Sequence, residues 1–177
     1  PLPVQDPLPP WPAADRLAEV AALIAAAERP LVLAGNGVIR AGAAAELDAF
    51  ATTLSIPVVM TFMAKGVIPR SHPMSLGTVG LSGNDLIACG FGRADLVLCV
   101  GYDMVEYHPE RWHRDPEQKV IHVGQLPAEV DAHYSLAAGL VGDIGAALSS
   151  LTERLTPRAD NWAAALNRAI QDENQEH

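Results

Sequence analysis

The chain has 177 residues, of which 49% are hydrophobic and 19% are charged. A chain of this length and composition can bury a hydrophobic core without disulfides or metal ions, so we expect one globular domain. The formal net charge is −9. An acidic surface repels nucleic-acid phosphates and anionic lipids, so neither nucleic acid nor membrane is an expected partner. The longest mainly apolar stretch, residues 20–27, is too short to span a bilayer.

The two ends of the chain differ in composition from its middle. Residues 1–10 contain five prolines, and we interpret residues 1–11 as an extended linker. The chain begins at Pro1 rather than Met and shows no signal-peptide pattern, and we expect a piece of a longer protein. Residues 157–177 are polar and are interpreted as a second linker or a terminal helix. The folded domain is therefore expected in residues 12–156.

The first half of this domain alternates helical patterns with short apolar runs. Apolar residues recur at helical spacing in residues 12–29, with Pro12 in a first-turn position that tolerates proline. The apolar run at residues 31–34 predicts a buried strand. Residues 43–54 form an alanine-rich pattern with one apolar helical face, and residues 56–61 predict a second strand.

The second half repeats the alternation after a long irregular segment. Residues 62–83 show no sustained period and contain several glycines and prolines, so we expect a long loop of a kind that is often functional. A short helix is expected at residues 85–92. Residues 95–101 are the clearest strand of the chain, residues 119–124 predict another, and residues 140–141 predict a last short one.

The pattern as a whole predicts the fold class. Asp143 is expected to cap the closing helix, residues 144–155, through its carboxylate. The expected strands are continuously apolar, which indicates burial on both faces and is typical of a parallel sheet covered by helices. We therefore predict an α/β fold with a Rossmann-like, doubly wound, mainly parallel sheet of five to six strands and helices on both faces. The crossovers are expected to be right-handed.

Small and polar residues stand at the carboxyl ends of the expected strands, where doubly wound sheets bind ligands. These residues are Gly35-Asn36-Gly37, Thr61, Gly101-Tyr102-Asp103 and Gly124-Gln125. Glycine at such an end lets a phosphate approach the backbone N–H groups. The alternative is that these glycines serve tight strand-to-helix turns. Asp103 is expected either to accept a ribose hydroxyl or to cap a turn, and both readings stay open.

No complete active site is apparent in the sequence. Lys65 is expected to be a solvated loop lysine, with phosphate binding as the alternative. The spacing of His108 and His113 matches no standard metal site, and His122 is expected to be a hydrogen-bonded core histidine. The chain has no CxxC, GxSxG or GxxxxGK[ST] motif, and its two cysteines are expected to be reduced. We therefore predict no catalytic residue and no metal ligand in this chain.

Six segments in order are RPLVLAGNGVIRAGAAAEL, IPVVMTFMAKGVIP, LGTVGLSGND, RADLVLCVGYDMVEYHPERW, KVIHVGQLPAEVDAHY and LVGDI. Their order over residues 31–155 resembles the central domain of thiamine-diphosphate-dependent enzymes such as acetolactate synthase, pyruvate oxidase and benzoylformate decarboxylase. The segments GYDMVEYHPERW and IHVGQLPAEVDAHY look closest to the acetolactate synthases, and among them to the catabolic, flavin-free type.

The resemblance implies an activity for a longer parent protein. Such an enzyme decarboxylates a 2-oxo acid, most simply pyruvate, on thiamine diphosphate, and then joins the bound carbanion to a second 2-oxo acid to give acetolactate. In this family the two flanking domains hold thiamine diphosphate and Mg²⁺. The central domain is expected to position those flanks and to help form a homo-oligomer in the cytoplasm, within branched-chain amino acid or acetoin metabolism. We expect the isolated piece to be inactive.

In the flavin-containing relatives the central domain holds FAD, at positions that correspond here to Gly35, Gly37, Thr61, Met63, Gly101, Asp103 and Gly124. Two departures from that pattern argue against FAD in this chain. Those relatives have an arginine shortly after the glycine that corresponds to Gly101, where this chain has Tyr102 and Asp103. The two acids of the family's I-D-I-D stretch are missing at residues 121–124. An FAD- or nucleotide-binding module is the alternative function, and a free-standing NAD-using enzyme is a third.

Overall fold

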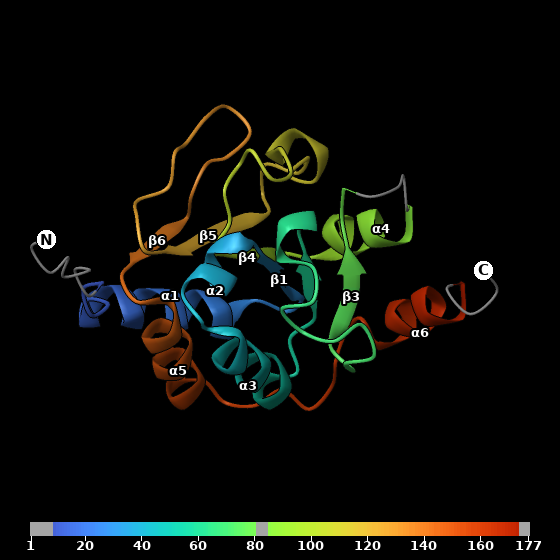
Figure 1. Ribbon diagram of the computed structural model, residues 1–177, viewed down its shortest axis with the longest axis horizontal. Coiled ribbons are helices and arrows are strands. Elements are labelled where there is room, and N and C mark those ends of the chain that lie inside the picture. Colours follow the sequence, from blue (N-terminus) through green and yellow to red (C-terminus); the bar gives the residue numbers. More distant parts are fainter. Residues whose placement is uncertain (1–8, 81–84, 174–177) are drawn as a thin grey trace, which may run out of the picture.

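The computed structural model describes residues 9–80 and 85–173. Within these ranges, six strands form one parallel sheet in the order β3-β2-β1-β4-β5-β6 (Figure 1). The strands are β1 (Pro30–Ala34), β2 (Val58–Met60), β3 (Ser75–Thr78), β4 (Leu96–Val100), β5 (Lys119–Gly124) and β6 (Ala138–Val141). The helices are α1 (Ala14–Ala26), α2 (Asn36–Arg40), α3 (Ala44–Leu54), α4 (Asp85–Arg93), α5 (Ile144–Arg154) and α6 (Ala164–Glu173), with 3₁₀ turns η1 (Phe62–Ala64) and η2 (Pro109–Arg111).

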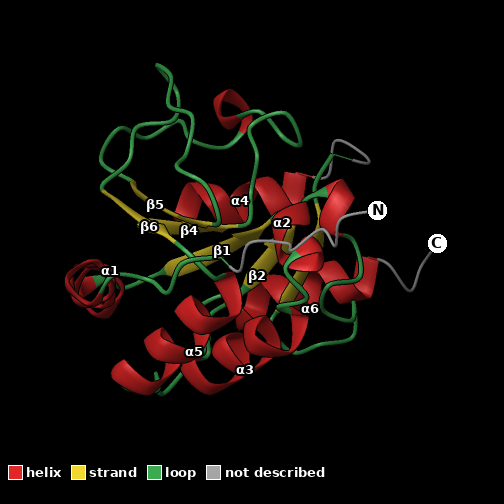
Figure 2. Ribbon diagram, turned by 60° about the vertical axis from the view of Figure 1, so that its left-hand side comes forward, coloured by secondary structure: helices red, strands yellow, loops and turns green. Residues whose placement is uncertain are grey.

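The central strands bury both of their faces, as their continuous apolar runs predicted. In β1, Val32 and Ala34 lie in an apolar cluster with helices α1, α3 and α5, whereas Leu31 and Leu33 lie in a second cluster with α4 and α6. Figure 2 shows α3 and α5 on one side of the sheet and α4 on the other. The prediction of a doubly wound parallel sheet with helices on both faces is therefore confirmed.

Two elements were missed in the sequence. The first is β3, which lies inside the segment expected to be a loop, of which residues 81–83 fall outside the described residues. Its sequence Ser-Leu-Gly-Thr has a single large apolar residue. Among the strands of the described ranges it pairs with β2 alone, across an irregularity between Val58 and Val59. Edge strands are commonly short, and a four-residue strand with one large apolar side chain gives little apolar signal.

The second missed element is α2, where Gly35-Asn36-Gly37 was interpreted as a turn. The chain enters a five-residue helix at Asn36 and leaves it at Ala41, so the turn and the helix coincide.

Asp143 behaves as expected, since its Oδ1 accepts a hydrogen bond of 2.7 Å from the Ala146 amide at the start of α5.

The segment after α5 packs against the domain. Arg158 donates to the carbonyl oxygens of Ile24 and Ala27 at the end of α1, at 2.8 Å each. Trp162 Nε1 donates to the Pro30 carbonyl, and α6 continues along β3 and α4.

The expected linker at residues 1–11 falls mostly outside the described residues, and the domain limits stay a prediction. Across the described ranges, no helix combines the length and apolar character needed to cross a membrane.

Candidate functional site

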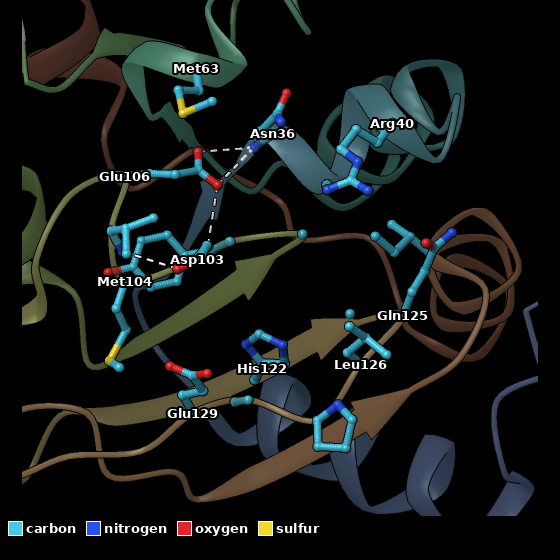
Figure 3. A pocket seen from close by; sticks show the side chains of 18 of the residues that line it. Asn36, Arg40, Met63, Asp103, Met104, Glu106, His122, Gln125, Leu126 and Glu129 are labelled. Carbon is cyan, nitrogen blue, oxygen red and sulfur yellow. Dashed lines mark hydrogen bonds between the residues drawn. The ribbon is translucent and has the colours of Figure 1, made fainter.

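The strand order changes direction between β1 and β4, and a crevice at the carboxyl ends of such strands is the usual ligand site of a doubly wound sheet. A cavity of about 410 Å³ lies there. It is bounded by α2, by the segment that follows β4 and by the segment that joins β5 to β6 (Figure 3). This cavity brings together most of the residues that the sequence singled out at the strand ends.

Three of the predicted glycines bring two backbones into contact at this crevice. An added Cβ on Gly35 would lie 2.5 Å from the Gly101 oxygen, and one on Gly37 would lie 2.7 Å from the same atom. Gly101 has a φ of 57°, and its own Cβ would lie 2.5 Å from the Val38 amide nitrogen. The Gly37 N–H already donates to the Gly101 oxygen at 2.8 Å. Close backbone packing therefore accounts for all three glycines without a ligand, and cofactor binding at them stays a prediction.

The Glu106 carboxylate occupies the polar centre of the crevice. The Asn36 amide at the start of α2 donates to both of its oxygens, at 3.2 and 3.0 Å. The Thr61 hydroxyl, at the end of β2, donates to Oε2 at 2.5 Å. The Asp103 amide, after β4, donates to Oε1 at 3.3 Å (Figure 3). One side chain thus accepts hydrogen bonds from three segments that each follow a different strand.

The remaining predicted cofactor positions also lie at this edge. Thr61 is fully buried and holds Glu106, while the Met63 side chain is half exposed at the cavity. Asp103 Oδ1 accepts a hydrogen bond from the Val105 amide, so the turn-capping alternative for this residue is present in the structure. A Cβ on Gly124 would lie 2.7 Å from His122 Nε2, so this glycine leaves room for a neighbouring imidazole.

His122 forms the buried floor of the cavity. Its Nδ1 lies 3.1 Å from the Tyr134 hydroxyl, as expected for a hydrogen-bonded core histidine. Burial lowers the pKa of His122 below its ordinary value of 6.5, although a backbone hydrogen bond at Leu126 and the Asp103 charge act in the opposite direction. Burial also raises the pKa of Tyr134 above its ordinary range and that of Cys99 to about 12. These groups stay uncharged near neutral pH.

An aromatic cluster fixes the two segments that wall the cavity. Tyr102 packs edge-on against Trp112 and Tyr134, with ring centroids 6.2 and 5.7 Å apart. The Tyr102 hydroxyl donates to the Tyr107 carbonyl at 2.6 Å. The segment after β4 and the segment after β5 are therefore held to the sheet by shared buried rings, which positions Glu106.

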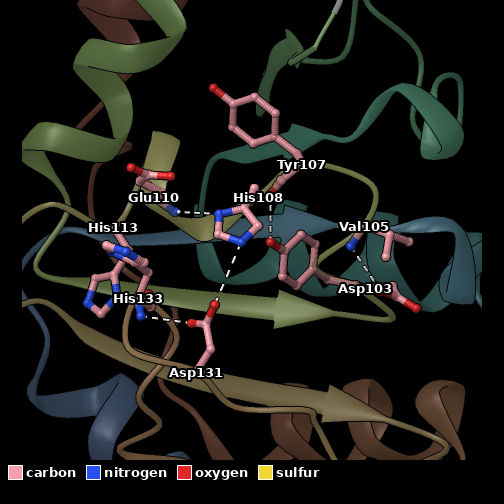
Figure 4. Close-up of polar contacts among 9 residues, drawn as sticks. Asp103, Val105, Tyr107, His108, Glu110, His113, Asp131 and His133 are labelled. Carbon is pink, nitrogen blue, oxygen red and sulfur yellow. Dashed lines mark hydrogen bonds and ion pairs between the residues drawn. The ribbon is translucent and has the colours of Figure 1, made fainter.

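Three histidines outside the cavity, His108, His113 and His133, join these same two segments (Figure 4). His108 accepts from the Glu110 amide, and its Nε2 lies 3.6 Å from an Asp131 carboxylate oxygen. His113 lies between the His133 carbonyl, at 2.7 Å, and the Gln118 carbonyl, at 3.2 Å. Over residues 9–80 and 85–173, no three or more His, Cys, Asp or Glu side chains are grouped to hold a metal ion.

Sequence reasoning missed Glu106, Glu129 and Arg40, which also line the cavity. Glu106 stands three residues after Asp103 within one short turn, in which the Glu106 amide donates to the Asp103 carbonyl at 3.0 Å. An acid at each end of a turn that follows a strand is a weak signal, and nothing in the local pattern indicates which of the two points inward. Lys65, by contrast, is exposed, in line with a solvated loop lysine.

The family model of the thiamine pyrophosphate enzyme central domain matches residues 17–151, most of the chain. The chain belongs to this family. Acetolactate synthase of Mycobacterium bovis is 36% identical over 159 residues, which cover 84% of this chain and 25% of the relative. A probable acetolactate synthase large subunit of Methanocaldococcus jannaschii is 35% identical over 141 residues, 79% of this chain and 24% of the relative.

Two further comparisons agree with this family membership. Glyoxylate carboligase of Escherichia coli O157:H7 is 35% identical over 157 residues, 84% of this chain and 26% of the relative. The structure of a putative thiamin diphosphate-dependent enzyme from Mycobacterium smegmatis superposes with a TM-score of 0.72 at 30% identity, covering 90% of this chain and 31% of that one. The resemblance to the central domain of thiamine-diphosphate-dependent enzymes, with acetolactate synthases among the relatives, is confirmed. This central domain spans about a quarter of the length of its curated relatives.

Proposed function

We propose that this central domain is part of a thiamine-diphosphate-dependent transferase of the acetolactate synthase kind. The observation that carries the proposal is the 36% identity to acetolactate synthase over 84% of the chain. The parent enzyme decarboxylates pyruvate and joins the product to a second 2-oxo acid, in the cytoplasm, in branched-chain amino acid or acetoin metabolism. The glyoxylate carboligase among the relatives supports ligation of 2-oxo acids as the shared reaction type.

The parts of the reaction are divided between this domain and the rest of the polypeptide. In the proposed parent enzyme the flanking domains would hold thiamine diphosphate and Mg²⁺, and the thiazolium ring would supply the electron sink of the reaction. The residues described here supply no group of metal ligands. The role of this domain is to hold the flanks in place and to contribute to a homo-oligomer.

Apolar side chains at the carboxyl edge of the sheet support a docking role for this domain. Large hydrophobic residues are exposed there, on the turns and segments that follow β2, β4 and β5: Phe62, Met63, Val105, Leu126 and Val130. Exposed apolar residues gathered at one edge are typical of a surface that meets other protein. We assign the flanking parts of the same polypeptide as the occupant, since this chain covers only 25% of the length of a relative.

The full-length polypeptide that carries this domain tests the proposal. Incubated with pyruvate, thiamine diphosphate and Mg²⁺, it is expected to release CO₂ and form acetolactate, which a colorimetric assay for acetoin detects after acid decarboxylation. The 177-residue chain under the same conditions serves as the control and is expected to form none. A full-length protein that consumes no 2-oxo acid, or a native polypeptide no longer than this chain, would contradict the proposal.

A further inference from the structure

The cavity between β1 and β4 lies where a doubly wound sheet binds the diphosphate of a dinucleotide, through backbone N–H groups at the strand ends. In this chain those donors already have partners. The Gly35 amide donates to the Val100 carbonyl at 2.9 Å and the Gly37 amide to the Gly101 carbonyl at 2.8 Å. The Asn36 amide, between them, donates to both oxygens of Glu106.

Glu106 is fixed in this place from three sides. Its Oε2 accepts from Thr61, a hydroxyl that is itself fully buried and that also accepts from the Ala64 amide. Its Oε1 accepts from the Asp103 amide within the same turn. A carboxylate with hydrogen bonds from two amides and a hydroxyl has the partners that a phosphate oxygen would otherwise take. To admit a diphosphate here, the protein must break these bonds and leave the carboxylate beside the incoming anion.

The other charged side chains at the cavity add to the same effect. The carboxylates of Asp103, Glu106 and Glu129 line it, and Arg40 is the one lysine or arginine among the residues that the structure places in the lining. Figure 3 shows Arg40 on α2 and Glu129 on the segment after β5, at separate walls of the cavity. A diphosphate in this cavity would therefore meet an excess of negative charge.

We infer that Glu106 is a built-in anion that saturates the donors at the ends of β1, β2 and β4, so that the cavity rejects the diphosphate of FAD or of another dinucleotide. The residues that face the cavity do not fit a flavin dinucleotide, although the fold offers a crevice at the right place. The same carboxylate links the segments that follow β1, β2 and β4 through its hydrogen bonds. Rejection of a dinucleotide is a property of the cavity alone and does not depend on the reaction of the parent enzyme.

The test measures flavin binding on the full-length protein and on three variants of it. Flavin fluorescence quenching with FAD, and titration calorimetry with ADP, are compared for the wild type, Glu106→Gln, Glu106→Ala and Glu129→Gln. The last variant removes the same charge from the lining while leaving the Glu106 hydrogen bonds intact, and it serves as the matched control. The wild type and Glu129→Gln are expected to show no saturable binding below ~1 mM.

Glu106→Ala is expected to bind ADP or FAD at least tenfold more tightly than the wild type, and Glu106→Gln to fall between the two. A wild-type protein that purifies with flavin, or that binds FAD at micromolar concentration, overturns the inference. It is equally overturned when a folded Glu106→Ala binds no better than Glu129→Gln. Acetolactate formation is measured separately, so a failure of this inference is distinguishable from a failure of the proposed function.

Hydrogen exchange keeps the inference testable when Glu106→Ala does not fold. In the wild type the Asn36 and Asp103 amides are expected to exchange slowly because Glu106 accepts from both. The peptide that contains Asn36 is expected to exchange at least severalfold faster in Glu106→Gln than in Glu129→Gln. Equal exchange in the two variants would show that Glu106 does not hold these donors.

Discussion

Replacing Gly101 by alanine separates a structural role for the strand-end glycines from a ligand-binding one. The new methyl group would lie 2.5 Å from the Val38 nitrogen and 2.7 Å from the Gly37 carbonyl carbon. Both are backbone atoms of α2, so no side-chain rotation can relieve the overlap. Two backbone segments must move apart, and the hydrogen bond from the Gly37 amide to the Gly101 oxygen is weakened with them.

The expected loss of stability follows from two contributions. Gly101 has a φ of 57°, and a residue with a Cβ in the left-handed region costs roughly 1–2 kcal/mol. Forcing a methyl group into closely packed surroundings costs a further ~1–3 kcal/mol. We therefore expect Gly101→Ala to lower the free energy of unfolding by about 3 kcal/mol. For a chain of 177 residues this corresponds to a fall in Tm of roughly 6–12 °C.

Thermal and urea unfolding of the 177-residue chain, followed by circular dichroism, measure this loss without any ligand present. Gly92→Ala is the matched control because Gly92 lies in helix α4 with open space around its Cβ position. Alanine there is expected to stabilise the helix by ~0.5–1 kcal/mol. A Gly101→Ala chain with the wild-type Tm would refute the packing argument and return these glycines to a ligand-binding role.

Three other measurements test the site and its surroundings. Burial lowers the pKa of His122 in the folded state below its ordinary value of 6.5. As the pH falls below about 6.5, the His122 imidazole is therefore protonated in the unfolded state before it is protonated in the folded state, and the wild type is expected to lose stability. His122→Gln should lose less over the same range, and identical pH profiles in urea unfolding would contradict this. Dithionitrobenzoate should modify only the exposed Cys89 in the folded chain and reach the buried Cys99 in urea; two rapidly reacting thiols without denaturant would exclude a buried Cys99. Asp143→Ala should lower the free energy of unfolding by ~1 kcal/mol, because the hydrogen bond from the Ala146 amide to the capping carboxylate is lost. Asp143→Asn should lower it much less.

The fold was predictable because the strands carry their own signal. Residues 31–34 and 96–100 are apolar at every position, and such short runs, alternating with helical patterns, are typical of central parallel strands. The cap of α5 is similarly local: Asp143 was expected to cap this helix, and its carboxylate accepts from the Ala146 amide three residues on. The edge strand β3 has no such signal, since its place in the sheet comes from pairing with β2 and from cover by α6.

The site was predictable only at the level of the sheet. Gly35, Thr61 and Gly101 could be placed at one edge because parallel strands end together. Glu106 is held inward by Asn36 and Thr61, 70 and 45 positions away in the chain, and the packing of Tyr102 ties the segment after β4 to the segment after β5. These contacts join residues far apart in the chain, and no short window of sequence contains them.

The glycines and Glu106 together give one physical account of this crevice. The two glycine-bearing turns meet closely, and the Gly35 and Gly37 amides donate to the carbonyl oxygens of Val100 and Gly101. The Asn36 amide, between them, is left as the donor that faces the crevice. That donor requires an acceptor, because an unpaired amide in a partly buried place costs free energy. A dinucleotide-binding relative of this fold can supply the acceptor from a phosphate, whereas this chain supplies it from Glu106. The glycine pattern can therefore persist without a cofactor, and its presence alone does not predict flavin binding.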